Sequence, residues 1–160
     1  MRAFTLLEVL IVVVILSFLI VGISGVLNLG NVAFPVDLGQ INLQNQARQA
    51  MQWITRDLRE ASGVTVGSGS NSVTFNNYSG SGISYYLDIG DTNGDDLANQ
   101  IIREFPAGSR RVVANDISGL VFTPDASNPL LLRIDITASR TILNRPFAFM
   151  LAEQVRLRNE

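Results

Sequence analysis

The chain has 160 residues, of which 47% are hydrophobic, and its formal net charge is −2 at pH 7. This length suits one globular domain and one membrane-spanning segment, and the weakly acidic charge gives no electrostatic attraction for nucleic acid as a main partner. Cysteine and histidine are both absent. Their absence excludes disulfide bridges and histidine-dependent triads, and it argues against a zinc site, because zinc prefers thiolate and imidazole ligands.

An uncharged apolar run over residues 9–27 dominates the amino-terminal part. As a helix this run would be roughly 28 Å long, close to the ~30 Å hydrocarbon core of a bilayer. Glu8 stands directly before it, and a carboxylate inside such a segment costs about 2–3 kcal/mol unless it finds a partner. A cleaved signal peptide would have a shorter apolar core and a small-x-small site, which Ser24-Gly25-Val26 matches poorly. The segment is therefore expected to be retained as a membrane span.

Three glycines and a proline, all unfavourable in a helix, lie in the last part of this run and just after it. Gly22, Gly25 and Gly30 each cost a helix about 1 kcal/mol relative to alanine. Pro35 is expected to break or kink a helix that reaches it. From these residues alone, the interpretation is the end of a membrane helix followed by a linker.

A second, amphipathic helix is predicted over residues 40–62, with Gly63 as its cap. Its apolar positions recur at steps of three and four: Leu43, Ala47, Ala50, Ile54, Leu58 and Ala61. A helix with one such stripe packs on its own domain's sheet. The charged residues 56–60 are interpreted as a solvated face with intrahelical pairs, each worth about 0.3–0.5 kcal/mol.

Beyond Gly63 the pattern changes to short runs of β-branched and aromatic residues, separated by turns rich in glycine, serine and asparagine. The predicted strands cover residues 64–66, 72–75, 83–87, 101–105, 112–114, 117–123, 130–138 and 147–156. A helix followed by a series of strands predicts an α+β fold in which the helix packs on an antiparallel sheet.

One acidic loop, residues 88–96, has the composition of a cation site. Asp91, Asn93 and Asp95 alternate as in the start of a calcium loop, because a hard cation needs several oxygen ligands on a tight turn. Asp96 could add a fourth ligand, but it stands where the EF-hand pattern has glycine, and Ile102 stands where that pattern has its bidentate glutamate. The alternative is a plain hairpin turn, for which Asn93-Gly94 is a strong signal. Calcium is therefore a tentative ligand.

The remaining side chains of chemical interest are assigned to structure. Arg110 and Arg111 are expected to pair across strands with Asp88 or Glu104. The aromatic residues, Trp53, Tyr85 and Tyr86 among them, are expected in the core. No serine, lysine or aspartate stands in a recognisable catalytic motif, so the protein is not expected to be an enzyme.

The sequence Ala3-Phe4-Thr5-Leu6-Leu7-Glu8, followed by the apolar run, resembles the class III signal of type IV pilins and type II secretion pseudopilins. The resemblance implies residues 1–3 as a short leader, which a prepilin peptidase removes between Ala3 and Phe4. It also implies N-methylation of Phe4 and pairing of Glu8 with the terminal amine of a neighbouring subunit. Where the family usually has glycine before the cut, this chain has Ala3.

Further stretches resemble the J-type minor pseudopilin and its type IV pilus counterpart: residues 56–61, 84–87, 113–120 and 155–159. The resemblance implies a pilin-like fold with a transmembrane and filament-core helix over residues 4–35. Residues 36–160 would form a periplasmic domain that includes the amphipathic helix. The long amino-terminal helix would loosen between these two parts.

The function that the resemblance implies is that of a minor pseudopilin in a type II secretion system. The subunit would sit in the inner membrane as a single-pass protein and assemble at the tip of a periplasmic pseudopilus. Its partners would be other pilin-like subunits, the prepilin peptidase, the inner-membrane assembly platform and membrane lipid. The alternatives are a minor or major pilin of a type IV pilus and, from a third class, a membrane-tethered binding domain or enzyme.

Overall fold

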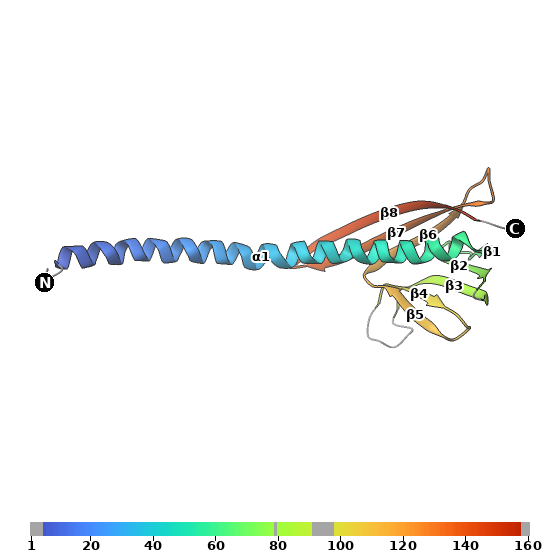
Figure 1. Ribbon diagram of the computed structural model, residues 1–160, viewed down its shortest axis with the longest axis horizontal. Helices are drawn as coiled ribbons and strands as arrows, with labels where there is room; N and C mark the ends of the chain where they lie inside the picture. The colour runs from blue at the N-terminus through green and yellow to red at the C-terminus, as the bar shows by residue number, and fades with distance from the viewer. Residues whose placement is uncertain (1–4, 79, 91–97, 158–160) are drawn as a thin grey trace. The chain divides into compact units, whose positions relative to one another are not determined.

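The computed structural model describes residues 5–78, 80–90 and 98–157. Within these ranges, one helix, α1 (Leu6–Arg59), precedes eight strands (Figure 1). The chain divides into two compact units, Met1–Gly39 and Gln40–Glu160. α1 contributes to both units, and the described strands all belong to the second.

The first unit consists of the apolar part of α1. A candidate membrane span covers Leu6–Asn28, with a mean hydropathy of 3.1. Two polar side chains within it are satisfied by the helix itself, because the Ser17 and Ser24 hydroxyls each donate a 2.8 Å hydrogen bond to a carbonyl one turn earlier. Beyond its first turn, the segment can therefore lie in lipid with its backbone groups and these two hydroxyls satisfied by the helix itself.

The helix does not break at Pro35. α1 continues through Gly30 and Pro35 to Arg59, so the expected break and the linker interpretation are wrong, while the expected kink stays a prediction. Proline fixes φ close to its helical value and removes one backbone hydrogen bond, and helix-compatible residues on both sides supply the rest of the ladder. The helix also ends three residues earlier than expected, because β1 (Ser62–Val66) begins at once and Gly63 lies inside it at φ +59°.

The second unit holds two antiparallel sheets, and the predicted α+β class is confirmed. The first sheet has the order β1-β2-β3-β4-β5, and the second has the order β6-β7-β8. Beyond β1, the strands are β2 (Ser72–Asn77), β3 (Gly80–Asp88), β4 (Gln100–Glu104), β5 (Arg110–Ala114), β6 (Ile117–Pro124), β7 (Leu131–Ile142) and β8 (Arg145–Arg156). Each strand contains most or all of a predicted one.

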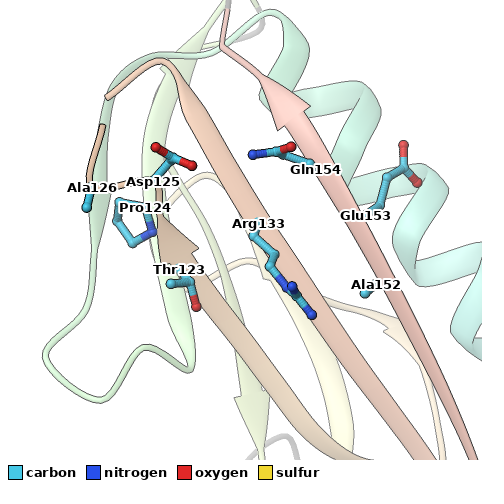
Figure 2. A pocket seen from close by; sticks show the side chains of 8 residues that line it. All are labelled: Thr123, Pro124, Asp125, Ala126, Arg133, Ala152, Glu153 and Gln154. Atoms are coloured by element: carbon cyan, nitrogen blue, oxygen red, sulfur yellow. The ribbon is translucent and has the colours of Figure 1, made fainter. Parts of the chain in front are cut away.

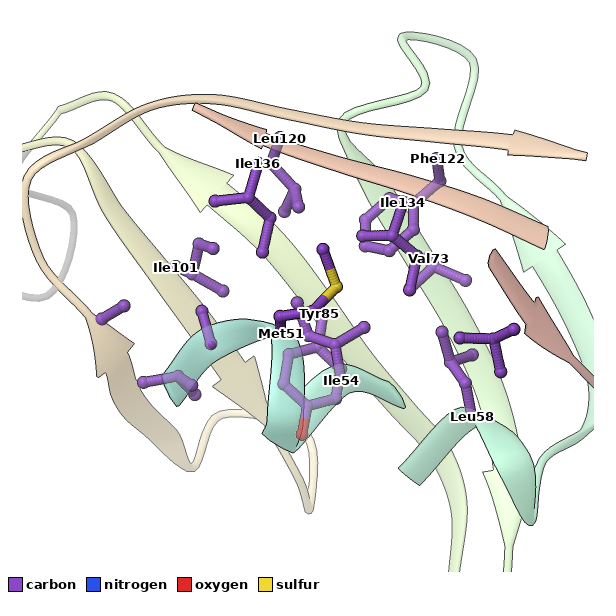
Figure 3. Close-up of a cluster of buried hydrophobic side chains, with 14 of the residues drawn as sticks. Met51, Ile54, Leu58, Val73, Tyr85, Ile101, Leu120, Phe122, Ile134 and Ile136 are labelled. Atoms are coloured by element: carbon purple, nitrogen blue, oxygen red, sulfur yellow. The ribbon is translucent and has the colours of Figure 1, made fainter. Parts of the chain in front are cut away.

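The core of the second unit forms between the helix stripe and the two sheets. Figure 3 shows Met51, Ile54 and Leu58 pointing from α1 into a cluster of side chains from the strands. The predicted stripe is confirmed, since all its members are 2% exposed or less: Leu43, Ala47, Ala50, Ile54, Leu58 and Ala61. Burying one large aliphatic side chain of this kind is worth about 1.5–3 kcal/mol, so the stripe fixes which face of the helix meets the sheets.

β6 connects the two sheets by backbone hydrogen bonds at both of its ends. The Ile117 N–H donates to the Asn99 carbonyl at 2.8 Å, and the Phe122 N–H donates to the Ser70 carbonyl at 2.7 Å. These bonds satisfy donors on the strand edge that β7 does not use. The second sheet is thereby held to the loops of the first.

Candidate functional site

The first turn of α1 is capped by Thr5. The Glu8 N–H donates to the Thr5 carbonyl at 3.0 Å and to its Oγ1 at 3.3 Å, and the Val9 N–H donates to the same carbonyl at 3.3 Å. Thr5 and Glu8 also have the spacing of a capping box. Thr5 therefore fixes where the helix starts, and Glu8 is the third residue of the helix.

Glu8 occupies a position where a carboxylate is favoured locally and has no countercharge nearby in sequence. Free N–H groups give the start of a helix a partial positive charge, which stabilises an anion there by about 0.3–1 kcal/mol. The Glu8 side chain is exposed. No basic residue occurs between Arg2 and Arg48 in the sequence. A full positive charge for Glu8 must come from the amino-terminal residues or from another chain.

The apolar helix surface behind Glu8 is uncovered within the chain. Its large side chains, from Leu6 to Leu27, are each 45–84% exposed. A soluble monomer rarely exposes an apolar surface of this extent. Lipid or other apolar helices must cover it in the working protein.

Asp57 is a site residue whose predicted position is wrong. It was expected on a solvated face, but it is only 7% exposed. The Tyr85 hydroxyl donates to its Oδ2 at 2.8 Å, and Arg103 Nε donates to the same oxygen at 3.0 Å. Tyr85 and Arg103 are direct neighbours across β3 and β4. One carboxylate thus joins α1 to two adjacent strands. Its position three residues after Ile54 was the available signal, because that spacing returns to the buried face.

Burial and the Asp57 carboxylate change the ionisation of its partners. Burial raises the pKa of Tyr85, and the negative charge of Asp57 and its hydrogen bond raise it further. For Arg103, burial alone lowers the pKa, but the hydrogen bond to Asp57 and the neighbouring Tyr85 reverse this, and the net shift is upward. Across the ordinary pH range, therefore, Tyr85 donates as a neutral phenol and Arg103 as a cation.

The shifted phenol predicts an alkaline loss of stability. Because the folded pKa of Tyr85 lies above the unfolded value of about 10, its contribution is complete below pH 10 and falls as the pH rises beyond it. Tyr85→Phe should lose about 1–2 kcal/mol near pH 8 and show a flatter profile above pH 10. Unfolding measured from pH 7 to 12 checks this. Tyr78→Phe, at a side chain that is 86% exposed, is the control, and an equally flattened profile for Tyr78→Phe would contradict the assignment.

A second contact between helix and sheet surrounds Trp53. The guanidinium carbons of Arg56 and Arg111 lie 4.2 and 4.9 Å from its ring centroid. Arg110 pairs with Glu104 at 3.5 Å, which confirms the expected cross-strand pairing for that arginine. The Gly108 N–H donates to Glu104 at 2.7 Å and lowers the pKa of its carboxyl. Tyr85 is buried as expected, whereas Trp53 and Tyr86 are only half-buried.

A hollow in the second unit lies over β6, β7 and β8 (Figure 2) and has a volume of about 590 Å³. Its charged side chains have structural partners. Asp125 accepts hydrogen bonds from the Ser127 and Asn128 N–H groups, and Glu153 pairs with Arg59 at 3.5 Å. Arg133 pairs with a carboxylate on its own strand. Nothing in the hollow resembles a nucleophile activated by a base.

Several predicted site residues lie outside the described part of the chain. These are Ala3 and Phe4 of the cleavage site and Asp91, Asn93, Asp95 and Asp96 of the acidic loop. Among the described residues, no group of three or more metal-binding side chains occurs. β3 and β4 pair up to Asp88 and Gln100, so the loop joins two antiparallel neighbours. This arrangement is compatible with both the calcium loop and the plain hairpin turn.

Comparison with known proteins identifies one segment. Residues 1–24 match the family model of the prokaryotic N-terminal methylation motif. No curated protein and no solved structure matches the chain. The match includes the expected cleavage site, Glu8 and most of the apolar span. It supports a type IV pilin-like protein that is anchored by a single membrane helix and associates with subunits of the same kind.

Proposed function

We propose that the chain is a minor pseudopilin of a type II secretion system, a structural subunit that assembles at the tip of a periplasmic pseudopilus. The methylation motif carries this proposal, together with the uncovered helix that it overlaps. The loose similarities of residues 56–61, 84–87, 113–120 and 155–159 to the J-type subunit favour a minor role. Residues 36–160 would be the periplasmic part.

The proposed mechanism is assembly into a filament. It follows from two requirements of the amino-terminal helix, which are a cover for its apolar side chains and a countercharge for Glu8. The apolar side chains exchange lipid for the apolar helices of neighbouring subunits, so they remain covered throughout. Glu8 exchanges a place near the membrane surface for a place beside the methylated terminal amine of a neighbour. Because a charge inside an apolar assembly is costly without a partner, Glu8 selects the register at which subunits join.

Gene deletion and complementation test the proposed function. Loss of the gene should leave exported proteins in the periplasm while surface fibres remain, and the wild-type gene should restore export. The protein should be scarce in sheared or overproduced filaments. Loss of surface fibres with normal export would favour a type IV pilus subunit, and high abundance in those fibres would make it the major pilin.

Processing of the amino terminus gives a direct prediction. The mature protein should begin at Phe4 with one methyl group on its amine, because Ala3-Phe4 stands at the expected cut ahead of Thr5 and Glu8. Intact-mass and peptide mass spectrometry of protein from native membranes measures this. Filaments composed of chains that retain Met1 would refute the prediction.

The acidic loop gives a metal prediction that also belongs to this proposal. If Asp91, Asn93, Asp95 and Asp96 bind calcium, the metal should stabilise the folded protein by about 2.7 kcal/mol at a hundredfold excess over Kd. Thermal unfolding in detergent with calcium, magnesium or chelator measures this. Magnesium is a strict comparison because it demands tighter octahedral geometry. Asp95→Ala should remove the shift, and Asp135→Ala should keep it. Identical transitions in all three conditions would leave the plain hairpin turn.

A further inference from the structure

The β7–β8 hairpin has a tip that no other described strand covers. β6 pairs with β7 only as far as the Ile117–Ala138 pair. Beyond it, β7 and β8 continue to pair with each other for four residues on each strand, up to Ile142 and Arg145. The turn between these two consists of Leu143 and Asn144. We call residues 140–146 the hairpin tip.

The tip carries an apolar side chain in a conformation that does not suit it. Leu143 and Asn144 have φ values of +49° and +61°, which is the geometry of a type I′ turn, where asparagine and glycine are preferred. A leucine there is strained, and its side chain is also 57% exposed. Neither the backbone strain nor the exposed apolar side chain stabilises the folded state. Residues of this kind are found at functional positions.

Basic side chains flank this leucine. Arg140 and Arg145 are both exposed. Arg140 pairs with Asp116 at 3.4 Å while half its side chain stays exposed. Arg145 has no ion pair within the part of the chain that the structure describes. An exposed leucine between two arginines combines the two residue types that bind an anionic lipid surface, since the leucine can enter the interface and the guanidinium groups can meet phosphates.

The tip lies at the end of the second unit where the chain enters it. β8 runs in the same direction as α1 (Figure 1), and its Glu153 pairs with Arg59. Going back eight strand residues from Glu153 to Arg145 covers a distance of roughly 27 Å. In a helix, roughly 18 residues cover the same distance, which leads back from Arg59 to about residue 41. The tip is therefore level with about Ile41, in the first turn of the unit.

We propose that the hairpin tip binds the anionic lipid surface of the membrane in the unassembled subunit. This proposal depends on the proposed function in one respect, which is that α1 must be inserted in the membrane. The helical residues from Asn28 to Ile41 separate the end of the candidate span from the level of the tip by at most roughly 20 Å, and tilting of the helix brings the tip closer to the lipid surface. Transmembrane helices are ordinarily tilted by about 20° and by as much as about 40°. Assembly would then release the tip together with the helix.

A fluorescence experiment on the full chain tests the contact. The protein has no cysteine, so Thr141→Cys and Thr123→Cys each give one labelling site on an exposed strand residue, the first at the tip and the second near the far end of the same sheet. Each variant is labelled with an environment-sensitive dye and reconstituted into vesicles that contain a headgroup spin label. The vesicles are purely zwitterionic or contain about one-third phosphatidylglycerol.

The expected result is strong quenching at position 141 in anionic vesicles, with little at position 123. Quenching at 141 should fall in zwitterionic vesicles and at high salt, because salt screens the attraction. Replacing both Arg140 and Arg145 by alanine should lower the ratio of lipid-bound to free tip by about twenty-five-fold, at about fivefold for each arginine near an anionic surface. Arg133→Ala, at another exposed and ion-paired arginine of β7, should change nothing.

Three outcomes would overturn the proposal. They are equal quenching at the two positions, quenching independent of lipid charge, and quenching that rises with protein density, which would identify a second copy as the partner. Flotation of the vesicles separates this failure from that of the proposed function. A chain that floats with lipid but keeps its tip free refutes only the lipid contact, whereas a chain that does not insert refutes the membrane anchor itself.

Discussion

Replacing Glu8 by alanine should leave the protein folded and inserted in the membrane but nearly absent from filaments. Insertion should improve, because removing an acidic group lowers the cost of placing the helix in lipid. Assembly should fail, because the terminal amine of the neighbouring subunit would then be buried without its carboxylate. Breaking a buried ion pair costs about 3–5 kcal/mol, so incorporation should fall by about a hundredfold or more. Immunoblots of filament and membrane fractions measure both quantities.

Two matched variants separate the charge of Glu8 from its part in starting the helix. Glu8→Gln keeps a side chain that can complete a capping box but has no charge, and it should fail to assemble. Thr5→Ala removes the hydroxyl that accepts from the Glu8 N–H. It should weaken the first turn by about 1 kcal/mol and still assemble. Normal incorporation of Glu8→Gln, or equal defects in all three variants, would show that the helix start matters and the charge does not.

The sequence predicts the strands of this fold well because their turns carry explicit chemistry. Glycine, serine and asparagine clusters bound most of the short apolar runs, and alternation along residues 132–136 assigned the buried face of β7 correctly. The stripe on the second half of α1 was equally readable, since each member returns to one face every three or four residues. What could not be read is how the strands divide into two sheets, because pairing depends on contacts between distant strands.

Two local rules misled the interpretation, and each did so for a physical reason. Pro35 was expected to break or kink the helix, yet α1 passes it without ending, because proline fixes φ close to its helical value and removes only one backbone donor. The charged residues 56–60 at the end of the helix were expected to face solvent. One of them, Asp57, instead binds Arg103 and the Tyr85 hydroxyl from the sheet. The partners of Asp57 lie 28 and 46 residues away, beyond the reach of any periodicity argument.

The buried carboxylate of Asp57 leads to the largest expected effect on stability. Asp57→Ala leaves Arg103, whose side chain is only 19% exposed, without its countercharge, and it leaves the Tyr85 hydroxyl without an acceptor. Removing one partner of a buried pair costs about 3–5 kcal/mol. For a domain of this size the unfolding midpoint should fall by 10 °C or more, at about 4 °C per kcal/mol. Trp53 is the single tryptophan of the chain, and it lies one turn before Asp57, so its fluorescence reports unfolding at this contact.

Control variants distinguish two possible causes of the lower stability of Asp57→Ala: the burial of the ion pair, or the loss of any ion pair. Asp135→Ala breaks an ion pair whose arginine side chain is 61% exposed, and exposed pairs contribute about 1 kcal/mol or less. A triple variant with Asp57→Leu, Tyr85→Phe and Arg103→Met removes every polar member at once. It should recover most of the stability, because a buried ion pair replaced by packed apolar side chains is often neutral or stabilising. If Asp57→Ala costs no more than Asp135→Ala, the carboxylate does not join the helix to the sheet. If the triple variant is as unstable as Asp57→Ala, the loss comes from packing, and the unpaired Arg103 is not its cause.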